Sequence, residues 1–222
     1  MTISPKVKIC GIQEEETLRV ALDAGADFIG LVFHPPSPRH VGVEQAASLA
    51  QIIKDFSVSK KIMSVGLFVD PEDRILDEIL STVSLDMIQL HGSETAERVW
   101  LVNQKTKLPV IKALSVSTED DFKRVSAYEN VVDWLLFDAK PADPDLPGGT
   151  GRTFEWSLLD GWTFSRPWML SGGLNADNVL EALSVLSPDA VDVSSGVESQ
   201  RGVKDAGKTR AFISKVKGLS GA

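Results

Sequence analysis

Residues 7–16 read VKICGIQEEE, an apolar run followed at once by a charged stretch. The apolar run is typical of a buried strand, and the three glutamates suit the solvated first turn of a helix. In an open, doubly wound sheet the first strand leads into the glycine pattern GxGxxG, and here the sequence reads CGIQEE instead. This stretch therefore favours the first strand–helix unit of a barrel over the competing open sheet.

Seven further apolar runs follow along the chain. Several are apolar at successive positions, as in parallel strands that are buried on both faces. The eight runs are 7–10, 28–33, 61–69, 87–91, 109–114, 131–138, 167–173 and 190–196. Helical spacing of apolar residues lies between them, for example at 43–50, 76–83 and 179–186. The alternation predicts an α/β fold, a (β/α)8 TIM barrel that residues 1–222 form as a single domain.

Capping residues predict where four of the helices begin, because short polar side chains at a helix start accept hydrogen bonds from its free backbone N–H groups. The four start signals are Asp70-Pro71, Ser93-Glu94, Thr118-Glu119 and Asn175-Ala176. The last one matters most for function, since it would place a helix N-terminus directly after two glycines.

Composition narrows the class of protein. The chain has 222 residues, 43% of them hydrophobic, a formal net charge of −8 and one cysteine. This is enough apolar material for a sizeable core, and one cysteine excludes an intrachain disulfide. The acidic balance argues against a nucleic-acid partner, and no apolar run is long enough for a membrane span or a signal peptide. We therefore expect a cytoplasmic protein with neither a nucleic-acid nor a membrane partner.

The chemistry of such a barrel is expected where its strands end, at their carboxyl side. The last two strands end in SGGLN (171–175) and DVSSG (192–196). Glycines let the backbone approach an anion, and these two loops often bind phosphate in this fold. Two such turns side by side favour a phosphate site over the alternative, which is a pair of merely tight turns. The expected ligands are Gly172, Gly173, Ser195 and Gly196, with Asp192 and Ser194 beside them in the substrate-binding set.

Three other side chains at strand ends are candidates. Asp138 ends an apolar run, and an acid at the rim of a dry core suits a general acid; a helix cap or an ion pair with Lys140 is the alternative. Arg39 follows the proline-stiffened PPSP and suits carboxylate recognition, although most loop arginines are simply solvated. His91 is either a ligand contact or a satisfied residue at the rim.

Other kinds of site find little support. With three histidines, no HxH or HxxxH spacing and no cysteine pair, we expect neither a metal nor a cofactor, and His34 and His40 read as loop residues. Residues 139–154 contain three prolines and three glycines without a helix or strand pattern. A connection of this length predicts a lid or a binding loop rather than a surface loop without a function.

Together these stretches resemble the phosphoribosylanthranilate isomerase family of the tryptophan pathway. The combination of KICG, QLHG, the sixth-strand aspartate and DVSSGVE is the specific part, and the motifs cover nearly the whole chain in family order. The matching motifs are KICG (8–11), PPSPRHV (35–41), VGLFV (65–69), QLHG (89–92), LLFDAK (135–140), GGTGRTFEW (148–156), LSGGLN (170–175) and VDVSSGVES (191–199).

The resemblance implies a metal-free Amadori rearrangement of N-(5-phosphoribosyl)anthranilate to 1-(2-carboxyphenylamino)-1-deoxyribulose 5-phosphate. By resemblance, Cys10 is the general base, Asp138 is the general acid, and Arg39 holds the anthranilate carboxylate. Cys10 must then be partly ionised, and Lys8 shares its strand face by the two-residue period. The implied partner is this small-molecule substrate, and we expect a monomer, with a homodimer as the alternative.

Three other functions compete with this interpretation. The related histidine-pathway isomerase would have an aspartate on its first strand, where this chain has Cys10. A pentose-phosphate epimerase would need metal-binding histidines. A non-catalytic phosphate binder on the same barrel would depend on neither Cys10 nor Asp138.

Overall fold

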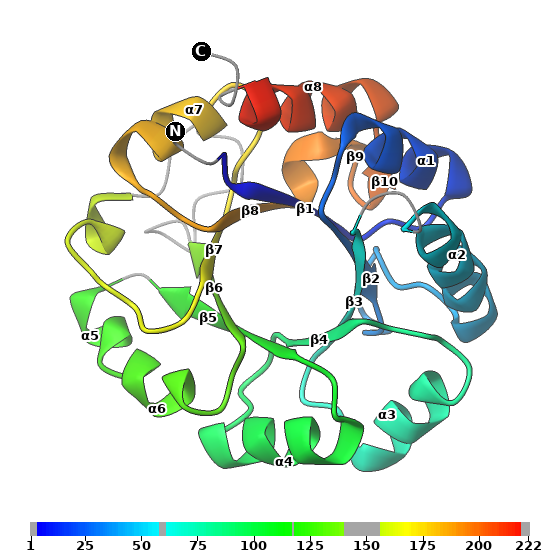
Figure 1. The fold of residues 1–222 in the computed structure, drawn as a ribbon, viewed down its shortest axis with the longest axis horizontal. Coiled ribbons are helices and arrows are strands. Elements are labelled where there is room, and N and C mark those ends of the chain that lie inside the picture. The colour runs from blue at the N-terminus through cyan, green and yellow to red at the C-terminus, as the bar shows by residue number, and fades with distance from the viewer. Residues whose placement is uncertain (1–3, 58–60, 117, 140–155, 219–222) are drawn as a thin grey trace.

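A closed ring of eight parallel strands, hydrogen-bonded in chain order, forms the centre of the molecule (Figure 1). The computed structural model describes residues 4–57, 61–116, 118–139 and 156–218. The strands are β1 (Lys6–Cys10), β2 (Phe28–Val32), β3 (Met63–Phe68), β4 (Met87–Leu90), β5 (Val110–Val116), β6 (Trp134–Ala139), β7 (Trp168–Ser171) and β8 (Ala190–Val193). Each predicted apolar run overlaps one strand, so the predicted (β/α)8 barrel is confirmed.

Helices surround the ring on its outer side (Figure 1). They are α1 (Glu15–Ala24), α2 (Val43–Phe56), α3 (Asp73–Leu80), α4 (Ala96–Thr106), α5 (Glu119–Phe122), α6 (Val125–Glu129), α7 (Val179–Val185) and α8 (Ala206–Lys217), with 3-10 turns η1 (Trp156–Leu159) and η2 (Ser195–Val197). A small antiparallel hairpin of β9 (Glu198–Gln200) and β10 (Val203–Lys204) follows η2. The sequence pattern did not predict this hairpin, because its strands are too short to show a period.

Two of the helices begin as predicted, and three begin later. The glutamate run opens α1, and Thr118 caps α5 through a reciprocal capping box. The predicted starts of α3 and α4 were each wrong by two residues, since Glu72 and Thr95 occupy the N-cap positions. Side-chain hydroxyls compete for this role, and Thr95 accepts the hydrogen bond from the Arg98 N–H.

The predicted start of α7 at Asn175 was also wrong. The Asn175 side chain accepts hydrogen bonds from the backbone N–H groups of Asp177 and Asn178, at 2.8 and 3.2 Å. These bonds close a turn ahead of the helix, which begins at Val179. The glycine turn after β7 is therefore separated from the helix N-terminus.

Both faces of the barrel strands are buried, which explains the continuous apolar runs. One face of the ring packs against the helices and forms the larger core cluster. The other face fills the barrel interior with Phe28, Val65, Met87, Ile111, Ala113, Leu136, Met169 and Ala190. Nearer the carboxyl ends of the strands, the buried interior also holds the charged pair Lys8–Asp192, which begins the functional site. The second buried pair, Lys112–Glu94, lies on the outer face of β5, where Lys112 also packs over the Tyr128 ring of α6.

Candidate active site

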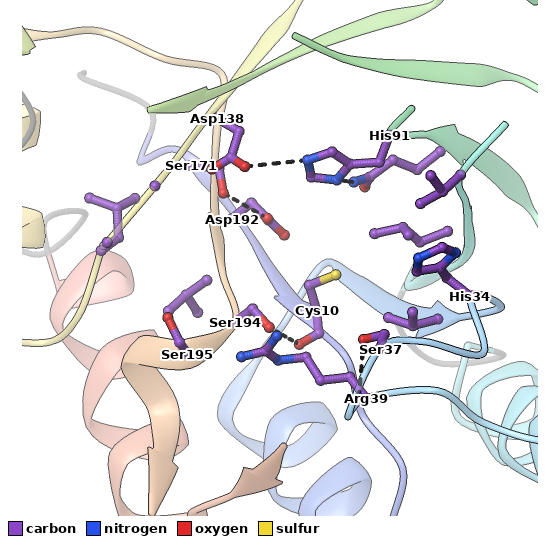
Figure 2. A pocket seen from close by; sticks show the side chains of 18 residues that line it. Cys10, His34, Ser37, Arg39, His91, Asp138, Ser171, Asp192, Ser194 and Ser195 are labelled. Carbon is purple, nitrogen blue, oxygen red and sulfur yellow. Dashed lines mark hydrogen bonds and ion pairs between the residues drawn. The ribbon is translucent and has the colours of Figure 1, made fainter. Parts of the chain in front are cut away.

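A cavity of about 330 Å³ opens where the barrel strands end (Figure 2). Every predicted site residue except Gly196 lines it, and the side chains come from strands on all sides of the ring. The predicted residues in its wall are Cys10, Arg39, His91, Asp138, Gly172, Gly173, Asp192, Ser194 and Ser195. The structure therefore brings together, in one cavity, residues that are up to 185 positions apart in the chain.

Cys10 is the last residue of β1 and is 4% exposed. Gly30, its neighbour on β2, makes room for the thiol, because a Cβ on that glycine would lie 2.9 Å from the sulfur. Burial raises the pKa of the Cys10 thiol, and the nearby ammonium of Lys8 only partly offsets this effect. Lys8 shares the face of Cys10, as predicted, yet the net effect of these surroundings favours the thiol form.

The reason is that Lys8 already has a partner. Its ammonium lies 2.7 Å from Asp192, and neither side chain is appreciably exposed. The other Asp192 oxygen accepts a hydrogen bond of 3.0 Å from the Ser171 hydroxyl. Burial alone would lower the pKa of Lys8, but the attraction of Asp192 outweighs it and leaves the pKa raised. A charged lysine thus lies beneath Cys10. It is held by Asp192 of β8, which is in turn held by Ser171 of β7.

Asp138 and His91 lie side by side in the wall of the cavity (Figure 2). The His91 Nε2 atom lies 3.3 Å from an Asp138 oxygen, and its Nδ1 atom lies 3.1 Å from the Gln89 amide nitrogen. The predicted alternative partner of Asp138, Lys140, lies outside the described residues. Asp138 and His91 are both partly open to the cavity, so a ligand there can reach either group.

The loop that carries His91 is fastened from below by a second buried ion pair. Lys112 lies 2.8 Å from Glu94 and donates a hydrogen bond of the same length to the Gly92 carbonyl. Glu94 in turn accepts from the backbone N–H groups of Gly92 and Asp70. These bonds hold the end of β4 rigidly beside the end of β3, which keeps His91 at the rim.

Arg39 is anchored rather than solvated. Its Nε and Nη2 atoms donate to the two oxygens of Glu198, at 2.6 and 3.0 Å. Lys204 lies 2.8 Å from the same carboxylate and also donates to the Ser194 carbonyl. The solvated alternative for Arg39 is therefore wrong. The β9–β10 hairpin supplies both anchoring residues.

The glycine turns after β7 and β8 form the remaining wall. Gly172 and Gly173 have φ values of 95° and 65°, a conformation that side chains rarely adopt. Gly196 packs against the Leu174 carbonyl, so closely that a side chain would overlap it. Gly196 is not among the residues that line the cavity, whereas Ser195 is, so the predicted phosphate contact of the Gly196 backbone stays a prediction.

Several residues of the site escaped the sequence reasoning. His34, which read as a plain loop residue, lines the cavity together with Ser37, Gln89 and Ser171. Gln89 lies two residues before His91, and the two-residue period of a strand could have indicated it. Within the described ranges, no cluster of three metal-ligating side chains is present, and no helix is long and apolar enough to cross a bilayer. The predicted lid, residues 139–154, falls outside these ranges except for Ala139.

Acidic, basic and thiol side chains around a glycine-walled cavity, at the carboxyl end of a closed barrel, are the arrangement found at the active site of a (β/α)8-barrel enzyme. Residues 7–215 match the family model of N-(5'-phosphoribosyl)anthranilate isomerase. The chain belongs to this family.

Individual relatives agree with the family match. The chain is 50% identical to the N-(5'-phosphoribosyl)anthranilate isomerase of Paramagnetospirillum magneticum, over 96% of this chain and 97% of that one. It is 49% identical to the isomerase of Rhodospirillum centenum, over 94% and 96% of the two chains.

Solved structures show the same likeness in three dimensions. The phosphoribosyl anthranilate isomerase of Thermotoga maritima superposes with a TM-score of 0.84 at 39% identity, covering 97% of this chain and all of that one. A second isomerase structure, in complex with reduced 1-(o-carboxyphenylamino)-1-deoxyribulose 5-phosphate, has a TM-score of 0.80 at 36% identity, with 97% and 100% coverage.

Proposed function

We propose that this chain converts N-(5'-phosphoribosyl)anthranilate into 1-(2-carboxyphenylamino)-1-deoxyribulose 5-phosphate. The observation that carries the proposal is that Cys10 and Asp138, a base and an acid, line one cavity with the glycine turns and Arg39. An aldose-to-ketose isomerisation needs one group that gives a proton and one that takes a proton. In the proposed reaction, Asp138 gives the proton and Cys10 takes the proton.

Asp138 acts first, as the general acid. It gives its proton to the furanose ring oxygen while the bond from that oxygen to C1 breaks. The lone pair on the anthranilate nitrogen forms a double bond to C1, which leaves an iminium ion. The partial exposure of Asp138 to the cavity supports this role, because the ring oxygen must come within hydrogen-bond reach.

Cys10 acts second, as the general base. Its thiolate removes the proton from C2, and the electron pair left behind forms the C1–C2 double bond and neutralises the iminium. The resulting enolamine gains a proton at C1 and loses one from the C2 hydroxyl, which gives the ketone. Burial raises the pKa of Cys10 and by itself favours the thiol. The positive iminium and Lys8 both favour its ionisation once substrate is bound.

The two ends of the substrate are held by different walls. The backbone at Gly172, Gly173 and Ser195 faces the phosphate, because left-handed glycine turns expose N–H groups to an anion. Arg39 faces the anthranilate carboxylate from the opposite loop, and Ser194 and Asp192 line the space between them. Holding both anions places the ribose between Cys10 and Asp138.

A fluorescence assay tests this function. Phosphoribosylanthranilate is generated in place from anthranilate, and its disappearance is followed with purified wild-type protein. We expect turnover, with losses of about a hundredfold or more in Cys10→Ala and Asp138→Asn. Absence of turnover by the wild type would refute the isomerase proposal. Near-normal turnover by either variant would refute the role given to that residue and leave the activity standing.

The proposal places the chain in tryptophan biosynthesis, as a cytoplasmic enzyme without a cofactor. One structural relative is a monomeric form that was generated from the dimeric isomerase of Thermotoga maritima. For this chain we keep the expectation of a monomer, with the homodimer as the alternative. Light scattering on the purified protein measures the mass directly, against 24.1 kDa for one chain.

A further inference from the structure

The substrate-facing arginine is held by a residue that lies outside the cavity wall. Glu198, at the start of β9, is 7% exposed and lies behind Arg39. Its two oxygens accept from Nε and Nη2 of Arg39, the side-on pair of the guanidinium. A guanidinium has five N–H donors in a rigid fork, and the pair formed by Nη1 and Nη2 can bind a second carboxylate end-on.

We propose that Glu198 is a positioning residue: it fixes the Arg39 guanidinium by its side-on pair and leaves the end-on pair to bind the carboxylate of the substrate. The inference rests on the proposed function, which supplies the substrate carboxylate. It adds the residue that gives Arg39 its orientation, and it assigns a role to a hairpin that carries no catalytic group.

Charge supports this arrangement. A lone arginine–glutamate pair would be neutral and would attract a substrate anion only weakly. Here Lys204 lies 2.8 Å from the same Glu198 carboxylate, so two cations share one anion and the cluster keeps a net positive charge. Lys204 is itself buried and donates to the Ser194 carbonyl, which ties the cluster to the end of β8.

The anchor is itself rigid. Besides its two cations, Glu198 accepts a hydrogen bond of 3.0 Å from the Gly202 N–H in the turn of the hairpin. Lys208 at the start of α8 donates to the Glu198 carbonyl, at 2.8 Å. Burial alone would raise the pKa of Glu198, but the bonds from Arg39, Lys204 and Gly202 lower it to about 2. The carboxylate is therefore charged whenever the protein is folded near neutral pH.

The stem of Arg39 is also seated. Gly11, directly after Cys10, has a φ of 80°, and a Cβ there would lie 2.7 Å from the Arg39 Cδ atom. The stem thus passes over the backbone next to the catalytic thiol, and Glu198 fixes the far end of the side chain. Figure 2 shows the Arg39 side chain extended along the cavity below Cys10.

A matched pair of ligands tests the inference. One ligand is reduced 1-(o-carboxyphenylamino)-1-deoxyribulose 5-phosphate, and the other is the same compound without the carboxyl group. We expect Glu198→Gln to weaken binding of the first about tenfold, because a misplaced arginine loses charge-assisted bonds, and to leave the second within about twofold. In turnover, KM rises by a similar factor while kcat changes by less than about threefold.

Two results would overturn the inference. Equal weakening of both ligands by Glu198→Gln would show a merely structural role, as would a fall in kcat with unchanged KM. If Glu198→Gln does not fold, judged by circular dichroism, Glu198→Asp keeps the charge but shortens the reach, and it is held to the same ligand comparison. If the wild type turns over the substrate but the Glu198 variant weakens both ligands equally, only the positioning role is refuted. A wild type without turnover refutes the proposed function first.

Discussion

The Lys8 ammonium lies 2.7 Å from the Asp192 carboxylate inside the barrel, where their side chains are 0% and 5% exposed. The pair joins β1 to β8, the two strands that close the ring. We expect Lys8→Met to lower the free energy of unfolding by about 3 kcal/mol, because it leaves a buried carboxylate without its cation. Urea unfolding measures the change.

The matched control is an exposed pair. Arg74→Met breaks the surface contact with Glu78 and is expected to cost less than about 0.5 kcal/mol. The double variant Lys8→Met/Asp192→Asn should lose less free energy of unfolding than the two single variants lose together. The reason is that the double variant no longer buries an unpaired charge. Strict additivity of the two changes would contradict a direct interaction between these side chains.

The reactivity of Cys10 should report its environment. Burial raises the pKa of this thiol, so we expect the folded chain to hold little thiolate at pH 7. We expect iodoacetamide to alkylate the folded protein slowly at pH 7, with a rate that still rises above pH 9, beyond the ordinary thiol pKa of about 8.5. The urea-unfolded chain, which has the same single cysteine, is the control and should level off near the ordinary value. A plateau below pH 8 in the folded protein would contradict the raised pKa.

Lowering the pH should reduce the stability that Glu198 contributes through its contacts with Arg39 and Lys204. The pKa of this carboxyl is lowered from 4.5 to about 2 in the folded chain. A lowered folded pKa means that the stabilisation is present above pH 4.5 and is lost as the pH falls towards 2. The difference in unfolding free energy between wild type and Glu198→Gln should therefore shrink by on the order of 3 kcal/mol over that window. A difference that stays constant from pH 6 to pH 2.5 would show that Glu198 is not a charged partner.

The contact of Gly196 with Leu174 gives a prediction about the proposed phosphate site, which is formed by the turns after β7 and β8. A Cβ at Gly196 would overlap the Leu174 carbonyl, so Gly196→Ala must push the two loops apart. We expect inorganic phosphate to inhibit this variant at least about tenfold more weakly than wild type, because misplaced backbone donors lose their anion bonds. Gly218→Ala, where a Cβ meets no atom within 4 Å, is the control and should leave inhibition unchanged. If phosphate inhibits both variants equally, the contact between the two loops does not contribute to phosphate binding.

The barrel and most of its site could be predicted from sequence, because both depend on local patterns. Eight apolar runs mark the strands, and in a parallel barrel all strand ends meet at one side. The position of Cys10 at such an end was enough to place it in the cavity. Asp138 was placed in the same way, at the end of the sixth run.

The supporting contacts could not be predicted, because they join residues that have no sequence relationship. Glu198 lies 159 positions after Arg39, and their contact depends on a hairpin of two short strands. The start of α7 was misplaced because an asparagine side chain can close a turn as readily as it caps a helix. The family resemblance named Arg39 as the carboxylate anchor, but it did not say what holds the guanidinium.

The pairing of the first strand with the last has a consequence for the order of events during synthesis. A nascent chain that still lacks β8 has made Lys8 and Cys10, but not the carboxylate that faces the lysine or the strand that closes the ring. The wall of the cavity beside Cys10 is thus complete only after almost all of the barrel has left the ribosome.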